Sequence, residues 1–457
     1  MKNFLLATAL LLIVFNSSAK QLPLLKVSND SNYLVTANNE PFFWLGGTAW
    51  ELIHRLNREE VDMYLEDRAN KGFTVIQTVI LAELDGLKTP NAYGQIPLND
   101  NDPNQLNEKY FEHVDYVIKK AGKLGMYIGL LPTWGDKFNK KWGTGPEIFT
   151  SNNAETYGQL LAQRYLKQKN IIWILGGDRA IENNEHDAII RSMVKGIRSI
   201  DQNHLMTFHP VGGKIASNFF DEDWLDFDMF QSGHNSKTFE FKYVQDSKKA
   251  HIKRPVINGE ARYENIPDRF WDNKDYGWLD DYDVRVSAYW TMLGGAAGYT
   301  YGCNDIWQMY DMTKNPIIGA RTGWEAALHL PGSSHMTYMK DLFTILPWQT
   351  MHLAQSVVLN DNPVNDSYIL CNMDANKEII IAYTPKGKAI KLNLPKLASE
   401  NIKAYWYNPR SGKSKFIGDF KTSRTHEFRP WSQGRGSDFI LIVVDAGHSI
   451  NDKLMSK

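Results

Sequence analysis

Residues 171–178 read I-I-W-I-L-G-G-D: five apolar side chains, two glycines and then a carboxylate. A short apolar run of this kind is typical of a strand that is buried on both faces, as in a parallel sheet covered by helices. The glycines permit a sharp turn, and the turn delivers Asp178 at the carboxyl end of the strand. A surface loop explains Gly-Gly-Asp equally well, so the meaning of Asp178 depends on what the other strands deliver to the same edge.

The same order of strand and helix recurs along most of the chain. One helix is predicted to begin after Asn57, where Glu60 supplies a capping box, and to end at Gly72. Further helical patterns cover about 109–124, 153–168, 185–200, 281–293 and 323–345, whereas the text after the fifth and sixth strands is short and irregular. Eight strands are predicted at 41–46, 73–81, 126–132, 171–175, 204–210, 227–232, 255–260 and 295–302. This alternation predicts the α/β class and a (β/α)8 TIM barrel.

The pattern changes beyond about residue 348 to strands without helices between them. Apolar and polar residues alternate there, and turn clusters such as Asn-Pro-Arg-Ser-Gly at 408–412 separate the runs. This predicts a small C-terminal antiparallel β-sandwich. The chain is therefore divided into a signal peptide at 1–19, a barrel with an N-terminal hairpin at 20–347, and the β-sandwich at 348–457.

The first twenty residues have the composition of a targeting segment. Lys2 is followed by an apolar stretch at 4–15 and by the small residues Ser17, Ser18 and Ala19. The stretch is too short to span a bilayer, so export to the periplasm or out of the cell is predicted, without membrane insertion. Cys303 and Cys371 lie far apart, and two free buried thiols are predicted rather than a disulfide.

Charge and motifs exclude several classes of partner. The 51 basic and 52 acidic residues leave a formal net charge of -1, so nothing favours nucleic acid or an anionic membrane surface. Neither a Cys/His zinc spacing nor a glycine-rich phosphate loop occurs, so no cofactor and no metal are predicted. Fourteen tryptophans and 21 tyrosines suit stacking on sugar rings, although an aromatic-rich core explains them too.

The candidate site lies at the carboxyl ends of the strands, where barrel enzymes hold their active sites. Asp178 and Glu260 end the fourth and seventh strands, on opposite sides of the barrel, and each follows a glycine. Glycosidic cleavage needs one carboxylic acid to protonate the leaving oxygen and a second carboxylate to attack or to activate water. Arg262 is expected to keep Glu260 ionised, and Asp178 then needs a raised pKa to act as the acid. For either residue alone, a salt bridge or a turn cap is the alternative.

Other polar and aromatic residues are predicted at the same mouth. His209 and His234 are expected to orient groups by hydrogen bonds rather than to transfer protons. The acids are candidates for binding sugar hydroxyls or for capping helices, and the tryptophans for stacking on sugars or for closing the barrel. Asp136 and Asn304 receive no role. The predicted substrate-binding residues are Trp50, Glu83, Asp85, Trp134, His209, His234, Arg262, Tyr301 and Trp307.

Seven sequence blocks, in order, resemble the apiosidase-like glycoside hydrolases over about residues 24–350. They include P-F-F-W-L-G-G-T-A-W at 41–50, Y-I-G-L-L-P-T-W-G-D at 127–136, W-I-L-G-G-D-R at 173–179 and N-G-E-A-R-Y-E at 258–264. The tail resembles the collagen-binding-type domain usually found behind that barrel. The resemblance implies a retaining-type glycosidase that removes apiose from the pectin rhamnogalacturonan II, with Asp178 as acid/base and Glu260 as nucleophile. The family usually has Asp where this chain has Gly47, and losing that acid is expected to remove a contact with a sugar hydroxyl.

The leading hypothesis is an exported glycoside hydrolase that acts on a terminal sugar of an oligosaccharide or polysaccharide. One alternative is a glycosidase for a different plant polysaccharide. Another is a carbohydrate-binding barrel with weakened or lost turnover, for which Gly47 is the reason. A third is adhesion to protein or matrix through residues 350–448, suggested only by the resemblance of the tail.

Overall fold

The computed structural model describes residues 22–456, so the predicted signal peptide lies outside the described residues. The described chain opens with a three-stranded antiparallel sheet of β1 (Leu25–Val27), β2 (Leu34–Thr36) and β3 (Pro41–Phe42). The hairpin predicted at the N-terminus is part of this sheet. Within residues 22–456, no helix combines the length and the apolar character that a membrane crossing requires.

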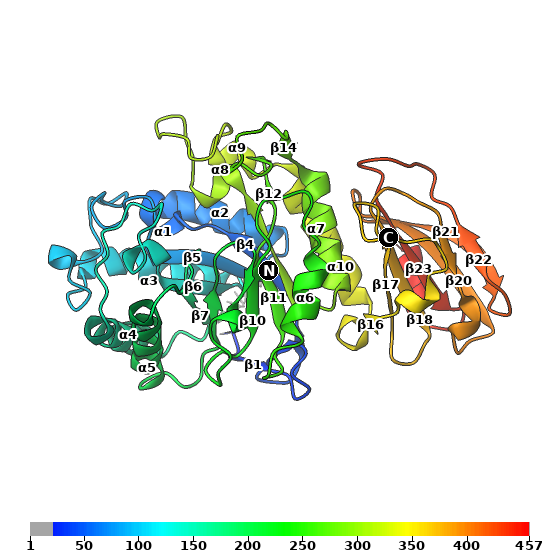
Figure 1. Ribbon diagram of the computed structural model, residues 1–457, viewed down its shortest axis with the longest axis horizontal. Coiled ribbons are helices and arrows are strands. Elements are labelled where there is room, and N and C mark those ends of the chain that lie inside the picture. The colour runs from blue at the N-terminus through cyan, green and yellow to red at the C-terminus, as the bar shows by residue number, and fades with distance from the viewer. Residues whose placement is uncertain (1–21, 457) are drawn as a thin grey trace, which may run out of the picture.

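Eight parallel strands form the barrel, and all eight predicted strands are confirmed (Figure 1). Hydrogen-bond ladders run in the order β8-β7-β6-β5-β4-β15-β11-β10, so the first strand of the barrel pairs with the last. Residues 41–42, expected in the first strand, belong to β3 instead. The barrel strands are β4 (Trp44–Thr48), β5 (Val75–Leu81), β6 (Tyr127–Thr133), β7 (Ile171–Gly176), β8 (Met206–His209), β10 (Asp228–Gln231), β11 (Val256–Glu260) and β15 (Gly298–Cys303).

The remaining seam of the barrel lies between β8 and β10, where no regular ladder is formed among the described residues. Single contacts join the strands instead. The Asp226 N–H donates to the Met206 carbonyl at 2.9 Å, and the Thr207 hydroxyl donates to the Phe227 carbonyl at 2.7 Å. β9 (Lys214–Ile215) pairs antiparallel with β10 beside this seam.

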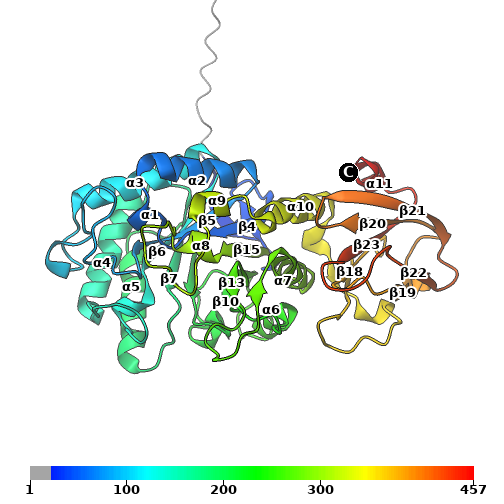
Figure 2. The same cartoon turned by 90° about the horizontal axis from the view of Figure 1, so that it is seen from above.

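Helices cover the outside of the barrel at the predicted positions (Figure 2). Asn57 and Glu60 form the expected capping box. Two departures occur: the fifth strand is followed only by a 3-10 turn at Ala216–Asn218, and the segment predicted as one helix at 323–345 is two helices, the second beginning at Pro331. The helices are α1 (Leu52–Arg55), α2 (Arg58–Asn70), α3 (Glu108–Lys123), α4 (Ser151–Tyr165), α5 (Asn184–Arg198), α6 (Glu240–Ser247), α7 (Asp281–Leu293), α8 (Asn304–Trp307), α9 (Trp324–Ala327) and α10 (Pro331–Ile345).

The C-terminal part is antiparallel, as predicted. A six-stranded sheet has the order β16-β17-β18-β23-β20-β21, and a two-stranded ribbon of β19 and β22 covers one of its faces. Helix α11 (Ile450–Met455) ends the described chain. The strands are β16 (His352–Leu353), β17 (Leu370–Met373), β18 (Ile379–Thr384), β19 (Ile390–Leu392), β20 (Asn401–Asn408), β21 (Lys413–Lys421), β22 (His426–Phe428) and β23 (Phe439–Asp445).

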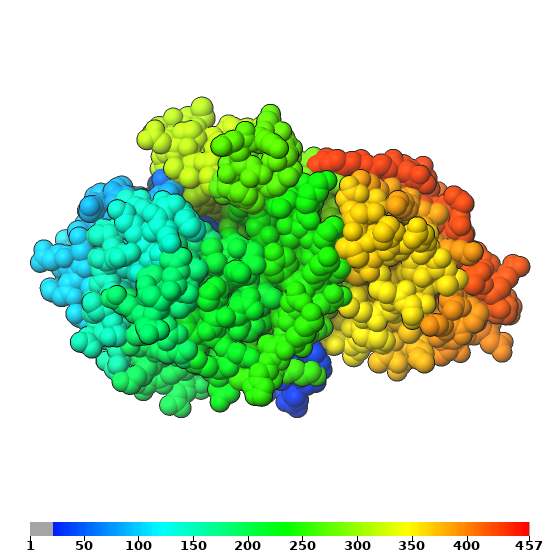
Figure 3. Space-filling view, in the orientation of Figure 1, coloured from blue at the N-terminus to red at the C-terminus, as the bar shows by residue number. Residues whose placement is uncertain are grey.

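The other face of the six-stranded sheet packs on barrel helices α7 and α10 (Figures 1 and 2). Apolar residues of the two parts belong to one buried cluster, in which Tyr289 of α7 stacks on Tyr383 of β18 with ring centroids 5.0 Å apart. The space-filling view shows the two parts in continuous contact along this side (Figure 3). The barrel and the C-terminal sheet therefore share a hydrophobic core.

A buried ion pair lies within the same contact. The Arg285 guanidinium on α7 donates to both carboxylate oxygens of Asp438, at 2.9 and 3.0 Å, and both side chains are almost fully buried. Arg410 and the Tyr383 hydroxyl donate to the same carboxylate at 2.9 and 3.1 Å. Such a fork-to-fork pair, with its remaining lone pairs used, fixes one relative orientation of the elements that carry it.

Candidate active site

A strained turn presents Asp178 at the end of β7. Gly176 and Gly177 have φ of 89° and 113°, and Asp178 itself has φ of 52°. A Cβ on Gly177 would lie 2.8 Å from the backbone nitrogen of Gly135, so only glycine fits there. Three consecutive residues with positive φ turn the chain sharply, and the last is a non-glycine held in a conformation that concentrates at functional sites.

Glu260, the last residue of β11, is buried between two histidines. Its Oε2 lies 3.0 Å from His209 Nε2, and its Oε1 lies 3.3 Å from His234 Nε2. His209 comes from the end of β8, and His234 lies three residues beyond β10. The strand ends thus bring both histidines to the same carboxylate. The sequence had predicted both histidines at the carboxyl ends of the strands.

The backbone fixes the tautomer of each histidine. The Asp178 N–H donates to His209 Nδ1 at 3.3 Å, and the Tyr263 N–H donates to His234 Nδ1 at 3.3 Å. Because Nδ1 accepts in both rings, an N–H of each imidazole lies on Nε2, the nitrogen that faces Glu260. Glu260 therefore has two imidazole groups beside it, and the amide of Asp178 helps to orient one of them.

Tyr263 adds a third group beside Glu260. The Trp50 indole N–H donates to the Tyr263 hydroxyl oxygen at 3.0 Å. Burial and then the negative charge of Glu260 raise the pKa of the Tyr263 phenol well above its usual value, so the phenol stays protonated. Sequence reasoning missed this residue, although it is the next but two after Glu260 in N-G-E-A-R-Y-E.

The two carboxyl groups have opposite pKa shifts. Burial raises the pKa of Asp178 to about 6, and the charge of Glu260 adds to the rise. Burial acts in the same direction on Glu260, but the contacts with His209 and His234 outweigh it and lower the pKa to about 2. At mildly acidic pH, one carboxyl is therefore protonated and the other ionised, which is the division of labour that glycosidic cleavage requires.

Arg179, which sequence reasoning quoted but gave no role, organises the acids around Asp178. Its buried guanidinium donates to the Asp178 carbonyl at 2.9 Å and to Glu83 Oε1 at 3.1 Å. Burial raises the pKa of Glu83 to about 7 against the lowering effect of Arg179, and the charges of Asp178 and Asp136 raise it further. Asp136, in turn, is buried in an ion pair with Lys137 at 2.7 Å. Glu83 thus lies in the site, where Arg179 bridges it to Asp178.

Trp142 is a further aromatic residue that sequence reasoning missed. It is 65% exposed, and the Arg179 guanidinium lies 4.2 Å from its ring centroid. An exposed tryptophan held by a buried arginine beside Asp178 borders the site. Its only sequence signal was the K-K-W-G-T-G-P stretch at 140–146, a loop without strand or helix periodicity.

The prediction that Arg262 keeps Glu260 ionised is wrong. The Arg262 guanidinium forms a buried ion pair with Glu240, with Nε 2.8 Å from Oε1, and Nη2 donates to the Thr238 carbonyl at 2.6 Å. Both contacts hold the buried Arg262 guanidinium against the start of α6 and the residues before it, so the prediction that Arg262 binds substrate is not supported either. The chain turns after β11, which directs Arg262 outward toward α6. His209 and His234, rather than Arg262, lower the pKa of Glu260.

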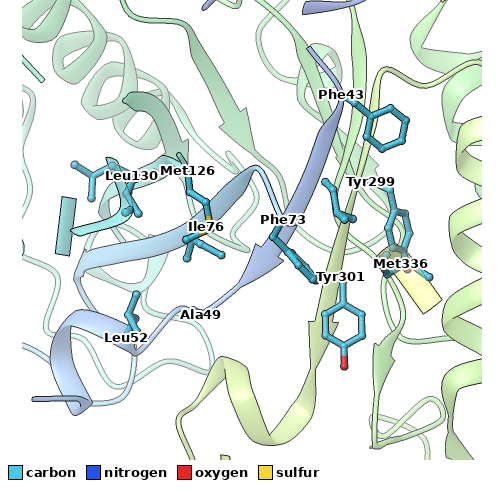
Figure 4. Packing of buried hydrophobic residues seen from close by; sticks show 14 of the residues in the cluster. Phe43, Ala49, Leu52, Phe73, Ile76, Met126, Leu130, Tyr299, Tyr301 and Met336 are labelled. Carbon is cyan, nitrogen blue, oxygen red and sulfur yellow. The ribbon is translucent and has the colours of Figure 1, made fainter. Parts of the chain in front are cut away.

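Tyr301 also lies away from the site. Its hydroxyl donates to Glu264 Oε2 at 2.6 Å, and its ring packs on Phe73 in the cluster between the barrel wall and the surrounding helices (Figure 4). Its neighbour Thr300 faces the interior instead, where it accepts a hydrogen bond from the Trp44 indole at 3.1 Å. The prediction that Tyr301 binds substrate is therefore wrong, because side chains alternate along β15 and Tyr301 points out of the barrel.

Gly47 does not face the barrel interior either. A Cβ at this position would point at Ile76 and Phe73, each 3.2 Å away, which belong to the outer cluster (Figure 4). A side chain there would not reach the space above the strands. The expectation that Gly47 removes a contact with a sugar hydroxyl is therefore wrong, and with it goes the reason for considering a barrel without turnover.

The remaining residues that were predicted to bind substrate differ in what their side chains contact. Asp85 caps its own turn, where Oδ2 accepts from the Thr89 hydroxyl at 3.0 Å. Trp50 and Trp134 are 2% and 3% exposed and pack against His209, with ring centroids 5.4 and 5.9 Å from the imidazole. Trp307 is 5% exposed and donates to Asn304 Oδ1. Sugar stacking by these tryptophans stays a prediction, whereas their packing around the histidine is observed.

Two family models match the chain. One, described as "Apiosidase-like, catalytic domain", covers residues 28–350, and the other, described as "Putative collagen-binding domain of a collagenase", covers residues 354–444. A search among curated proteins finds no match.

Two solved structures are similar over nearly the whole chain. One is described as a glycoside hydrolase; it is 33% identical, with a TM-score of 0.85, over 94% of this chain and 98% of that one. The other is a glycoside hydrolase family 5 protein from Bacteroides vulgatus, 32% identical with a TM-score of 0.85 over 94% of each chain. A third, from the same organism and 14% identical with a TM-score of 0.69, shares the fold.

Proposed function

The chain belongs to the apiosidase-like glycoside hydrolase family, and from this premise we propose that its Asp178 and Glu260 cleave a terminal sugar from a plant-type polysaccharide. The family and the similar structures make it a glycosidase. Apiose on a side chain of rhamnogalacturonan II is the proposed substrate. The name of the matching family and the seven sequence blocks support this choice.

In the proposed reaction, Asp178 protonates the glycosidic oxygen while Glu260 attacks the anomeric carbon. The bond to the leaving alcohol breaks and a covalent glycosyl-enzyme forms with Glu260. Asp178, now ionised, takes a proton from water, and the water attacks the anomeric carbon and releases Glu260 as a carboxylate. The sequence of two displacements retains the anomeric configuration.

The observation that carries this proposal is the environment of Glu260. Two imidazole groups, 3.0 and 3.3 Å from its oxygens, favour its ionised form, and its charge raises the pKa of Asp178. An ionised, oriented carboxylate serves as a nucleophile, and a carboxyl with a pKa near 6 serves as an acid and then as a base. His209 connects them, because one nitrogen meets the Asp178 amide and the other faces Glu260.

The test compares the unmodified protein with the Glu260→Gln and Asp178→Asn variants on rhamnogalacturonan II oligosaccharides. We expect the unmodified protein to release apiose, Glu260→Gln to lose at least about a thousandfold in rate, and Asp178→Asn to lose about 10²- to 10⁴-fold. Chromatography identifies the sugar, and proton NMR of the first product gives its anomeric form. Full activity of Glu260→Gln would remove the assignment, and an inverted first product would exclude the covalent route.

We also propose that the protein is exported and that residues 1–19 are removed. The charged start, apolar stretch and small residues of this segment support it. The test expresses the full chain in a Gram-negative host and determines the N-terminus of protein from the periplasm and the medium. A mature chain that begins near Lys20 is expected, and cytoplasmic retention with an intact Met1 would contradict export.

A further inference from the structure

A cavity of about 430 Å³ lies beside the site and is lined by neither Asp178 nor Glu260. Its lining comes mainly from the end of β13 (Ile266–Pro267) and from the loop that leads to β14 (Trp278–Leu279), which projects at the top of the barrel half (Figure 3). Its size falls within the range of about 300–1,000 Å³ found for small-molecule sites. The mechanism above makes no use of this loop.

The walls of the cavity combine aromatic rings with polar groups that have no partner. Phe270 and Tyr276 line it and are 39% and 36% exposed, and the Arg269 guanidinium lies 3.3 Å from the Tyr276 ring centroid. Asp272 and Lys274 also line it, and neither side chain has a hydrogen bond or an ion pair within the described part of the chain. Aromatic faces beside free hydrogen-bonding groups suit a sugar ring, which has apolar faces and a rim of hydroxyls.

The loop is joined directly to the site. The Arg269 N–H donates to the His234 carbonyl at 3.0 Å, and the Phe270 ring centroid lies 6.0 Å from the His234 ring. His234 Nε2 is in turn 3.3 Å from Glu260. Asp268 anchors the base of the loop, because its carboxylate accepts from the amide and the hydroxyl of Ser236 at 3.1 and 2.6 Å. The cavity is therefore held at a fixed position next to the proposed nucleophile.

We infer that this cavity is a carbohydrate subsite that binds a second sugar of the same oligosaccharide, adjoining the sugar that is cleaved. The inference rests on the proposed function and adds a binding site to it. Phe270 and Tyr276 provide the stacking surfaces, and Asp272 and Lys274 bind hydroxyl groups at the rim. The loop consequently selects for oligosaccharides over small glycosides that carry the same terminal sugar.

The experiment compares kcat and KM of Phe270→Ala, Tyr276→Ala and Tyr276→Phe on two substrates. These are rhamnogalacturonan II oligosaccharides and 4-nitrophenyl apiofuranosides of both anomeric forms. We expect each alanine variant to raise KM for the oligosaccharides about five- to tenfold, as one lost stacking contact does, and to leave the aryl glycosides unchanged. Tyr276→Phe keeps the ring and stays near the unmodified protein. Phe416→Ala, which removes a 44% exposed aromatic ring from the distant strand β21, is the matched control.

Binding is measured separately by calorimetry with the same oligosaccharides on the Glu260→Gln protein, with and without Tyr276→Ala. Weaker binding with Tyr276→Ala supports the subsite even if no substrate is hydrolysed, which separates it from the proposed reaction. Unchanged KM and unchanged binding in both alanine variants would overturn it. An equal loss on aryl glycosides and oligosaccharides would overturn it too, because the loop would then only support His234. If the Glu260→Gln protein bound none of these oligosaccharides, the proposal of a subsite would be overturned as well.

Discussion

Asp178 and Glu260 are both carboxyl groups at strand ends, and their neighbours make them different. The pKa of about 6 for Asp178 and about 2 for Glu260 predict activity between these values. As pH rises through about 6, Asp178 loses its proton, so kcat/KM is expected to fall about tenfold for each further unit. The measurement is kcat/KM from pH 3 to 9. A level profile from pH 6 to 9 would contradict the assignment, and Asp178→Asn should lack the alkaline fall.

The histidines provide a second prediction at this scale. Removing His209 or His234 takes away a group that lowers the pKa of Glu260, while burial still raises it. In His209→Ala and His234→Ala we therefore expect the acidic limb of the pH profile to move to higher pH and kcat to fall. His329→Ala, which removes an exposed histidine, is the control. An unmoved acidic limb in both site variants would show that the histidines do not hold Glu260 ionised.

The sequence predicted both carboxylates and both histidines, because each follows an apolar run and strand ends of a barrel converge. The predictions for Arg262 and Tyr301 were wrong, because they depended on the direction in which each side chain points. For Tyr301, alternation along the strand was available as a signal, since Thr300 and Tyr301 must face opposite ways. For Arg262, the direction depends on how the chain turns after Glu260, and spacing in the sequence does not contain that information.

The turn after β7 is the element on which the position of Asp178 depends. Gly177→Ala would place a Cβ 2.8 Å from the Gly135 nitrogen at a φ of 113°, so the turn must shift. We expect a loss of about 1–3 kcal/mol in the free energy of unfolding and a fall in kcat as Asp178 moves. Gly323→Ala is the control, because a Cβ there meets no atom within 4 Å and its φ is negative. Urea unfolding measures the free energy of unfolding of both variants, and initial rates give their kcat. Equal stability and equal kcat of Gly177→Ala and Gly323→Ala would contradict this prediction.

Helices and strands were predicted correctly where the hydrophobic periodicity agreed with the capping and turn residues at their ends. The eight strands were found because each is a short apolar run between helical patterns, and Asn57 with Glu60 marked a helix start that the structure has. The prediction failed at 323–345, where helical composition continues across a break before Pro331, a residue that favours a helix start. After the fifth strand, the irregular text corresponds to a segment with no α-helix.

At the scale of the whole molecule, the shared core predicts that the two parts unfold together. Asp438→Ala removes the carboxylate that Arg285 and Arg410 share and leaves the buried Arg285 with Asp281 alone, so we expect a loss of about 3 kcal/mol in unfolding free energy. Lys249→Ala is the control: it removes an exposed lysine that pairs only with the exposed Asp246, so it is expected to cost about 1 kcal/mol or less. Urea unfolding followed by tryptophan fluorescence should show one transition in the unmodified protein. Two separate transitions would contradict the coupling.

Truncation tests the proposed division of the chain at residue 347. A protein that ends there exposes the apolar face of α7 and α10, which the six-stranded sheet covers. We expect residues 20–347 to express mainly as aggregate, and gel filtration of any soluble fraction to show oligomers. A monomeric truncated barrel with a normal melting temperature would show that the contact contributes little. The sequence predicted the C-terminal strands, but not which face meets the barrel, because both faces of its central strands are apolar.

The shared core also bears on how such proteins change over generations. Between α10 and β16, the connection offers no free linker: Leu346 is 3% exposed, and Trp348 packs edge-on against Phe43, with ring centroids 5.3 Å apart. The two similar glycoside hydrolases match across 94% of this chain, and so carry both parts. A gene rearrangement that exchanged one part alone would leave two mismatched apolar faces, so the catalytic barrel and its sheet are expected to be inherited as one unit.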